Sequence, residues 1–241
     1  MSDLEDMIKA LQEGKEEYDR RKAASVHTSF ALLERYGQMT SQSQPDGRIA
    51  LGNNLDYMDH ICKHDKLEGT LQLIYVDPPF FSKSKYQASL TLQSPALGKS
   101  SLIKIDAYDD FRASELHSYL QMLTVRLYRM RDLLSETGCI AVHLDWHVAH
   151  YVKVIMDEIF GREHFINEII WTYKSGGTGR KYFARKHDTL LLYGKTNHYK
   201  FHTLKEKSYN RGLKPYRFQG VEEFQDEKGW YTMVNMKDVW N

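Results

Sequence analysis

The 241-residue sequence has few cysteines, no long hydrophobic run and no secretory leader. Its two cysteines, Cys62 and Cys139, lie far apart and form no CxxC pair, so both are expected to be ordinary reduced thiols. No apolar stretch approaches the roughly 20 residues that a bilayer-spanning helix needs. The N-terminus is rich in Asp, Glu and Lys and lacks the order of a secretory signal. These absences predict a soluble, cytoplasmic protein without a membrane role.

Charge is balanced overall but unevenly distributed along the chain. The formal net charge is +1, yet the segment between Trp171 and Phe218 holds twelve basic and two acidic residues, a net charge of +10. The remainder, with 21 basic and 30 acidic residues, has a net charge of −9. Such a segregated field is suited to holding a polyanion against one face of the molecule. A solvated basic surface without a ligand would have the same composition.

The pattern of apolar residues predicts an α/β protein. Leu71 to Val76 and Gly138 to Leu144 predict strands, and Ala113 to Leu134 has apolar residues at helical spacing between them. Strands that alternate with helices indicate βαβ units and a mostly parallel, Rossmann-like sheet. The other expected elements are a short strand at Arg48 to Leu51, a helix at Leu55 to Lys63, a polar loop at Ser82 to Lys104, a helix at His147 to Phe160, and strands at Phe165 to Tyr173 and Thr189 to Tyr193.

Composition divides the chain into three predicted regions. Residues 1–46 are expected to be a helical extension and linker, because Asp3 to Tyr36 carries good helix formers and is followed by Ser, Gln, Pro and Gly. Residues 47–198 are expected to form the core. Residues 199–241 are polar and rich in aromatic residues, which indicates either the start of a recognition region or core strands whose partners are missing. The aromatic residues are Tyr209, Tyr216, Phe218, Trp230 and Trp240.

The motif with the clearest chemistry is Asp77-Pro78-Pro79-Phe80, directly after the strand that ends at Val76. Ligand sites in open α/β sheets form at the carboxyl ends of strands. Two prolines fix the backbone and donate no amide hydrogens, so rigid carbonyls lie beside a carboxylate and an aromatic ring. This acceptor-only pocket suits the exocyclic amino group of a flipped nucleobase, with Phe80 stacking on the base. The structural alternative for Asp77 is a turn or cap aspartate before proline.

These four residues resemble the Asp/Asn/Ser-Pro-Pro-Tyr/Phe/Trp motif of the S-adenosylmethionine-dependent DNA amino-methyltransferases. The resemblance extends from about Arg48 to Tyr193 and is to the modification subunits of type III restriction-modification systems, in the group that has the catalytic motif early in the chain. The segments that follow in the family's order are Tyr108 to Phe111, Gly138 to His147, Met156 to Gly161, Asn167 to Trp171 and Gly179 to Asp188. The resemblance implies a Rossmann-like methyltransferase core at residues 47–198.

The resemblance also implies an activity. A methyl group would pass from S-adenosylmethionine to adenine N6 in duplex DNA, and a restriction subunit would be the partner protein. Asp77, Pro78, Pro79 and Phe80 would be catalytic, and Asp77 and Pro78 would also contact the cofactor. Asp in the first position favours adenine, with cytosine N4 as the alternative base.

Basic and aromatic residues in two segments of the predicted core are the expected contacts to DNA. The first group follows the catalytic motif in a polar segment, where solvated lysines are the alternative. The second group interleaves with Tyr182 and Phe183, a pattern that suits contact with the nucleic-acid backbone and specifies no sequence. The predicted DNA-binding residues are Lys83, Lys85, Tyr86, Arg180, Lys181, Arg185 and Lys186.

One family feature has no match in the sequence. The Phe-x-Gly-x-Gly loop that holds the methionine part of the cofactor is not found after Tyr193, and Gly176 to Gly179 leads into basic residues rather than into a helix. We therefore expect that a C-terminal partner chain or a homodimer completes an incomplete core. The alternative is a catalytically inactive DNA-binding fragment or regulatory subunit.

Three histidines, His143, His147 and His150, have spacings that raise the question of a metal site. No cysteine or carboxylate set lies at ligand spacing with them, so structural roles and no metal are expected. Asp145 ends the strand next to the catalytic one. It is expected to cap the following helix, with a place in the pocket wall as the alternative.

Overall fold

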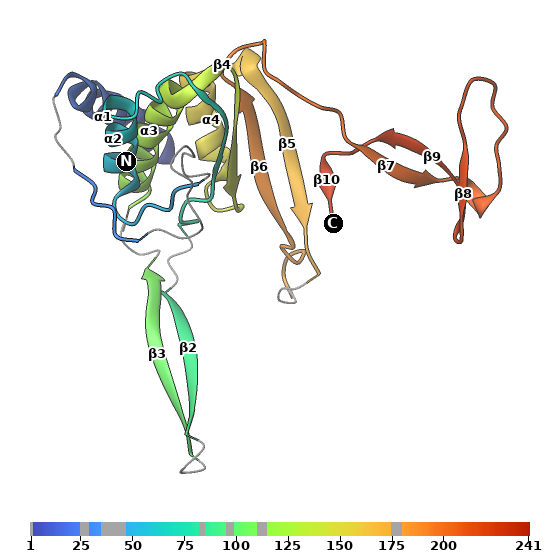
Figure 1. Ribbon diagram of the computed structural model, residues 1–241, viewed down its shortest axis with the longest axis horizontal. Coiled ribbons are helices and arrows are strands. Elements are labelled where there is room, and N and C mark those ends of the chain that lie inside the picture. Colours follow the sequence, from blue (N-terminus) through green and yellow to red (C-terminus); the bar gives the residue numbers. More distant parts are fainter. Residues whose placement is uncertain are drawn as a thin grey trace, which may run out of the picture.

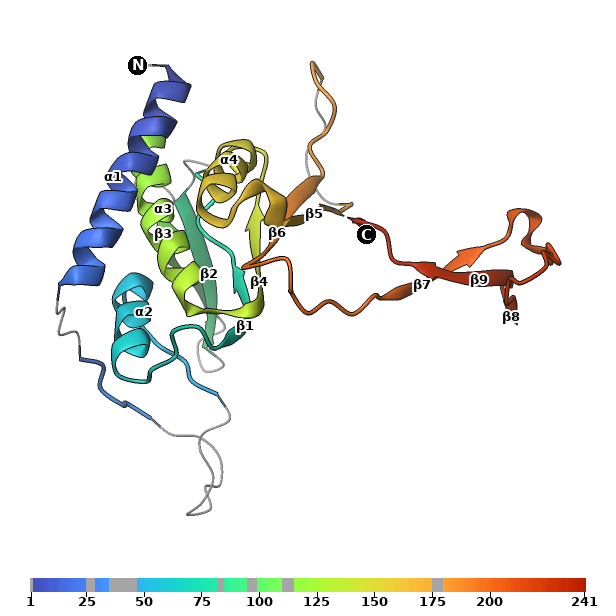
Figure 2. The same ribbon diagram turned by 90° about the horizontal axis from the view of Figure 1, so that it is seen from above.

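A computed structural model describes residues 2–24, 29–34, 47–81, 85–94, 99–109, 115–174 and 180–241. Its core is a five-stranded sheet in the order β1-β4-β6-β5-β10, with helices packed against one face (Figures 1 and 2). The strands are β1 (Leu71–Val76), β4 (Leu134–Leu144), β6 (His187–Gly194), β5 (Phe165–Thr172) and β10 (Val239–Trp240). The helices are α1 (Asp3–Ala23), α2 (Asn54–Lys63), α3 (Leu116–Leu133) and α4 (Ala149–Phe160), with 3-10 turns η2 (Arg162–His164) and η3 (Arg211–Leu213).

The hydrophobic core lies between the helices and one face of the sheet. Ile140, Val142 and Leu144 alternate along β4 and are fully buried, and Leu191 and Tyr193 of β6 belong to the same cluster. Side chains of a strand alternate between its two faces, so the residues between these, His143 among them, belong to the opposite face. Because Ile140, Val142 and Leu144 face the helices, His143 lies on the face of the sheet that is turned away from them.

Helix α1 is part of this core, since it lies along α3 (Figure 2). Its buried residues include Ala10, Gly14 and Tyr18. A Cβ at Gly14 would lie 2.7 Å from the side chain of Thr124 in α3, so only glycine permits this approach. The N-terminus of α1 has a capping box between Ser2 and Glu5, which satisfies backbone N–H groups that would otherwise be unpaired.

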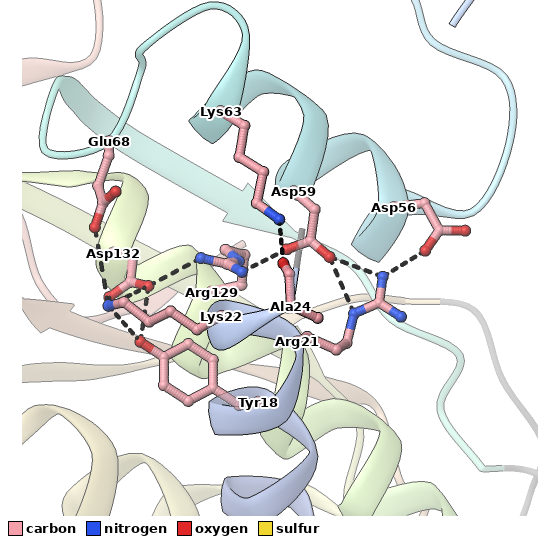
Figure 3. A network of polar contacts seen from close by, with 10 residues as sticks. All are labelled: Tyr18, Arg21, Lys22, Ala24, Asp56, Asp59, Lys63, Glu68, Arg129 and Asp132. Atoms are coloured by element: carbon pink, nitrogen blue, oxygen red, sulfur yellow. Dashed lines mark hydrogen bonds and ion pairs between the residues drawn. The ribbon is translucent and has the colours of Figure 1, made fainter. Parts of the chain in front are cut away.

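A polar network joins α1 to α2 and α3 (Figure 3). Asp59 of α2 is 1% exposed and pairs with Arg21 at 2.8 Å and with Arg129 at 2.6 Å. Arg129 also pairs with Asp132 at 3.2 Å, and the Tyr18 hydroxyl donates to Asp132 at 2.8 Å. Burial raises the pKa of Tyr18, so its hydroxyl stays protonated. The network fixes three helices relative to one another through charges that are largely removed from water.

Two further β structures extend from the core (Figure 1). The antiparallel hairpin of β2 (Lys85–Ser94) and β3 (Lys99–Asp109) follows the Asp77 motif. A separate antiparallel sheet, in the order β7-β9-β8, consists of β7 (Lys205–Tyr209), β8 (Phe224–Asp226) and β9 (Gly229–Asn235). After β9 the chain returns, and β10 pairs with β5 in the core sheet. The aromatic tail thus contains both a separate sheet and one core strand.

The fold is α/β, as predicted, but the sheet is mixed rather than mostly parallel. β1 pairs parallel with β4, and β10 pairs parallel with β5, whereas β6 is antiparallel to both of its neighbours. A parallel pair requires a long crossover connection, usually a helix. β5 and β6, which residues 173–186 connect, are instead antiparallel neighbours, and such a pair needs no crossover.

Three predicted elements differ in the structure. The first helix ends at Ala23 rather than Tyr36, and in residues 29–34 Leu32 and Leu33 are exposed, so no burial would stabilise further turns. Arg48 to Leu51 is not a strand, because Ile49 and Leu51 are fully or nearly fully exposed and pair with no sheet. The polar segment Ser82 to Lys104 contains most of the β2–β3 hairpin. None of the helices in the described residues has the length and apolar character that crossing a bilayer requires.

Candidate active site at the ends of the core strands

The Asp77 motif begins where β1 ends, and its first residue projects into solvent. The Asp77 side chain is 57% exposed, Pro78 is buried and Phe80 is half-buried. The next residue, Phe81, has a φ of 57°, a left-handed conformation that is rare for a bulky side chain, and its ring packs on Tyr119 of α3 at 5.4 Å. Phe81 therefore anchors the turn in the core and leaves the carboxylate of Asp77 accessible.

His143, near the end of β4, lies at the centre of the residues around Asp77. It is 7% exposed, and its Nδ1 is 3.8 Å from a carboxylate oxygen of Asp77. Its ring meets Phe80 edge-on, with centroids 5.4 Å apart, and lies 5.5 Å from the ring of Trp171 in β5. The end of the sheet thus has one exposed carboxylate beside a group of aromatic rings.

Two hydrogen bonds fix the imidazole of His143. Its Nδ1 is 2.9 Å from the Tyr75 hydroxyl, and its Nε2 is 3.3 Å from Asp188 of β6, whose other carboxylate oxygen accepts a bond from Tyr173. Burial, followed by the charges of Asp77 and Asp188, raises the pKa of Tyr75. Burial and Asp188 likewise raise the pKa of Tyr173. Both phenols therefore remain hydrogen-bond donors at neutral pH.

A second aromatic group surrounds Arg185, which lies just before β6. The guanidinium of Arg185 lies 3.6 Å from the ring centroid of Trp146 and 4.8 Å from that of Tyr182. The ring of His147 lies 3.8 Å from that of Trp146 and is tilted by 31°, and Phe183 is 96% exposed. Cation–π contacts of this kind hold Arg185 in a defined place while its segment stays on the surface.

The structure tests the expected role of Asp145 and of the histidines. Asp145 accepts a bond from the backbone N–H of His147 and pairs with its ring at 2.5 Å. It therefore closes the turn before α4, whereas the N-cap of α4 is Val148, without a side-chain cap; the expectation that Asp145 caps this helix is wrong. His147 has a structural role here, and His150 is exposed on α4. Among the described residues, no group of His, Cys, Asp and Glu has the arrangement of a metal site.

The predicted DNA-binding residues fall into two places. Lys83 lies outside the described residues, and Lys85 and Tyr86 begin strand β2 of the hairpin. Arg180, Lys181 and Arg185 are exposed just before β6, and the Lys186 amine reaches the Lys174 carbonyl. The second group thus lies on the chain segment that leads directly to Asp188 at the site.

Sequence reasoning missed several residues of this site, namely Tyr75, Trp146, Trp171, Tyr173 and Asp188, and it gave His143 a structural role. One signal was present: Tyr75 and Asp77 are two residues apart and so share a face of an extended chain. The others lie on β5 and β6 or just after β4 and β5, and only the strand order brings them together.

Comparison with known proteins assigns a family to this arrangement. A family model described as DNA methylase matches residues 71–241. Among curated proteins, the type II methyltransferase M.EcaI of Enterobacter cloacae is 31% identical over 83% of this chain and 41% of its own length. M.KpnI of Klebsiella pneumoniae is 29% identical over 62% and 32%, and the StyLTI Mod subunit of Salmonella typhimurium is 26% identical over 60% and 23%. The chain therefore spans less than half the length of these relatives.

Solved structures give a weaker likeness. The M1.HpyAVI–SAM complex matches 66% of this chain and 60% of its own, with 13% sequence identity and a TM-score of 0.38. The cytosine-N4-specific PvuII DNA methyltransferase matches 62% and 49%, with the same identity and TM-score.

Proposed function

Because the chain belongs to the DNA methylase family, we propose that it is the part of a DNA amino-methyltransferase that binds and activates the target amino group. Methyl transfer goes from S-adenosylmethionine to adenine N6 in duplex DNA, within a restriction-modification system. The observation that carries this proposal is the exposed Asp77 carboxylate at the end of β1, with Phe80, Trp171 and His143 around it. Catalytic roles for Asp77, Pro78, Pro79 and Phe80 are part of the proposal.

The proposed chemistry depends on hydrogen-bond acceptors. An exocyclic amine is a weak nucleophile, because its lone pair is delocalised into the base. When the Asp77 carboxylate and the Pro78 carbonyl each accept one N–H, the nitrogen becomes more pyramidal and its lone pair points to the methyl donor. Phe80 stacks on the base after it has flipped out of the duplex. The protein thus acts by positioning, and this chemistry does not require a metal.

The residues around Asp77 fit one part of the cofactor, its positively charged sulfur. S-adenosylmethionine supplies a methyl group on a cationic sulfur, and a carboxylate beside aromatic rings stabilises a cation. Asp77 and Pro78 are the residues proposed to face it.

Product analysis tests the reaction and the choice of base. The purified chain is incubated with duplex DNA and S-adenosylmethionine, the DNA is digested to nucleosides, and the methylated products are identified by mass spectrometry. N6-methyladenine is expected. If N4-methylcytosine alone is found, adenine is the wrong base, although the family assignment stands.

A second candidate function is DNA binding without methyl transfer, as in a regulatory subunit. It is supported by the exposed basic segment at residues 180–186, which needs no cofactor in order to bind DNA. Under this alternative, duplex binding persists, weakens steeply with salt and is indifferent to replacement of Asp77. Methylated product would exclude it.

We expect the basic segment to bind phosphates. Replacing Arg180 and Lys181 with alanine removes two exposed cations, so the slope of log affinity against log salt should become shallower by about two. The loss should be similar for unrelated duplex sequences, because phosphate contacts carry no base information. The matched control replaces Lys9 and Lys15 of α1, which removes the same charge elsewhere. An unchanged salt slope in the Arg180/Lys181 variant would place the DNA on another surface.

A further inference from the structure

His143 is a buried, titratable side chain that the proposed chemistry leaves unused. It lies between two carboxylates, 3.8 Å from Asp77 and 3.3 Å from Asp188. Tyr75 is its third polar neighbour, and Phe80 and Trp171 are the rings packed against it. Tyr173, on the far side of Asp188, completes the ionisable groups that face it among the described residues. An apolar residue would fill this place at lower cost if packing were the only need.

The hydrogen bonds determine which imidazole nitrogen carries the proton. An ionised carboxylate only accepts, so Nε2 of His143 must donate to Asp188. In the neutral ring Nδ1 is then unprotonated, and it accepts from the Tyr75 hydroxyl at 2.9 Å. Because the pKa of Tyr75 is raised, that hydroxyl has a proton to donate. The basic nitrogen of His143 consequently lies on the side of Asp77.

We propose that His143 accepts, through Asp77, the proton that the target amine loses on methylation. This inference rests on the proposed methyl transfer. The amine nitrogen forms a bond to the methyl carbon as the carbon–sulfur bond breaks and its electron pair stays on sulfur. The nitrogen, now positively charged, gives one proton to the Asp77 carboxylate. The Tyr75 hydroxyl turns its proton away from Nδ1 of His143, and Asp77 closes from 3.8 Å to hydrogen-bond distance and passes its proton to that nitrogen. The Nδ1–H then donates to the Tyr75 oxygen, and the proton leaves to water after turnover.

The arrangement gives each neighbour a distinct part in this step. The imidazolium would lie between the carboxylates of Asp77 and Asp188. Asp188 also keeps the proton of the neutral ring on Nε2, as a carboxylate fixes the tautomer of the imidazole in a catalytic triad. Asp77 is thereby returned to its ionised form, in which it can bind the next amino group. His143 touches Asp77 rather than the base, so it is a positioning and proton-accepting residue.

The tautomer can be measured without any methylation assay. Long-range nitrogen–proton NMR correlations on the full chain with labelled histidine, assigned with His143→Gln, report which ring nitrogen is protonated. We expect the Nε2–H form at neutral pH in the wild type and a mixture of forms in Asp188→Asn. The control Asp226→Asn, in the separate β7-β9-β8 sheet, should leave the His143 signals unchanged. An Nδ1–H form in the wild type would overturn the inference.

The second readout is the pH dependence of single-turnover methyl transfer. His143→Gln should lower the rate at pH 7 by about 100-fold and change the dependence of the rate on pH, because the acceptor is gone. Duplex affinity should stay within about two-fold, and the control His150→Gln, at an exposed position of α4, should behave as wild type. A slow variant that keeps the wild-type pH profile would give His143 a merely structural role. If the wild type itself transfers no methyl group, the proposed function fails, and the tautomer measurement still decides the inference.

Discussion

Replacing Asp77 with alanine is expected to lower the rate of methyl transfer on the order of 10³-fold, with duplex affinity nearly unchanged. The carboxylate is proposed to hold the amine in its reactive geometry and to take its first proton. It is 57% exposed, and its ion-pair partner in the described part of the chain is His143 at 3.8 Å, so removing it should cost little stability. Single-turnover rates, duplex titration and thermal unfolding together check these three expectations.

Asp77→Asn separates the two parts of that role. Asparagine keeps an oxygen that accepts an N–H bond but cannot take a proton at neutral pH. We therefore expect a rate between those of the wild type and Asp77→Ala. The matched control is Glu158→Ala, which removes an exposed carboxylate from α4. If Asp77→Ala transfers methyl groups at the wild-type rate, Asp77 does not bind the amine, and the catalytic role proposed for the motif is wrong.

Hydrophobic periodicity was sufficient to predict the elements that build the core. The strands predicted from Leu71 and from Gly138 appear as β1 and β4, and the helices predicted at Leu55 to Lys63 and at His147 to Phe160 appear as α2 and α4. Their bounds are close to those expected, because each element buries one apolar face. The β2–β3 hairpin was missed. Apolar residues such as Ala88, Leu90 and Leu92 alternate with polar ones there. Because the segment is also rich in Ser, Gln and Lys, its composition predicts a loop.

The site was predictable only where it is local in sequence. Asp77 to Phe80 follow one strand, so both their identity and their position at a sheet edge could be predicted. His143, Trp171 and Asp188 lie on three strands, and their proximity depends on β6 being inserted, antiparallel, between β4 and β5. That order depends on how β5 connects to β6, and the hydrophobic periodicity of the sequence gives no information about this connection. The roles of the motif and of the basic residues stay predictions.

Replacing Asp59 with alanine is expected to be the most destabilising single change in the network of Figure 3. Asp59 is 1% exposed and pairs with Arg21 and with Arg129, whose side chain is 4% exposed. Without Asp59, the Arg129 charge stays buried with Asp132 as its remaining partner. Breaking a buried ion pair in this way costs about 3–5 kcal/mol, which lowers the unfolding temperature by roughly 6–20 °C. Urea unfolding followed by circular dichroism measures the loss.

Asp56→Ala is the matched control, because Asp56 pairs with the same Arg21 at 2.5 Å but is 32% exposed. An exposed pair contributes at most about 1 kcal/mol, so this variant should stay close to wild type. Replacing Asp59 and Arg129 together with leucine and methionine removes both charges and should recover much of the lost stability. If Asp59→Ala is no less stable than Asp56→Ala, then packing at Gly14 and Tyr18, rather than the buried charges, holds α1 to α2 and α3.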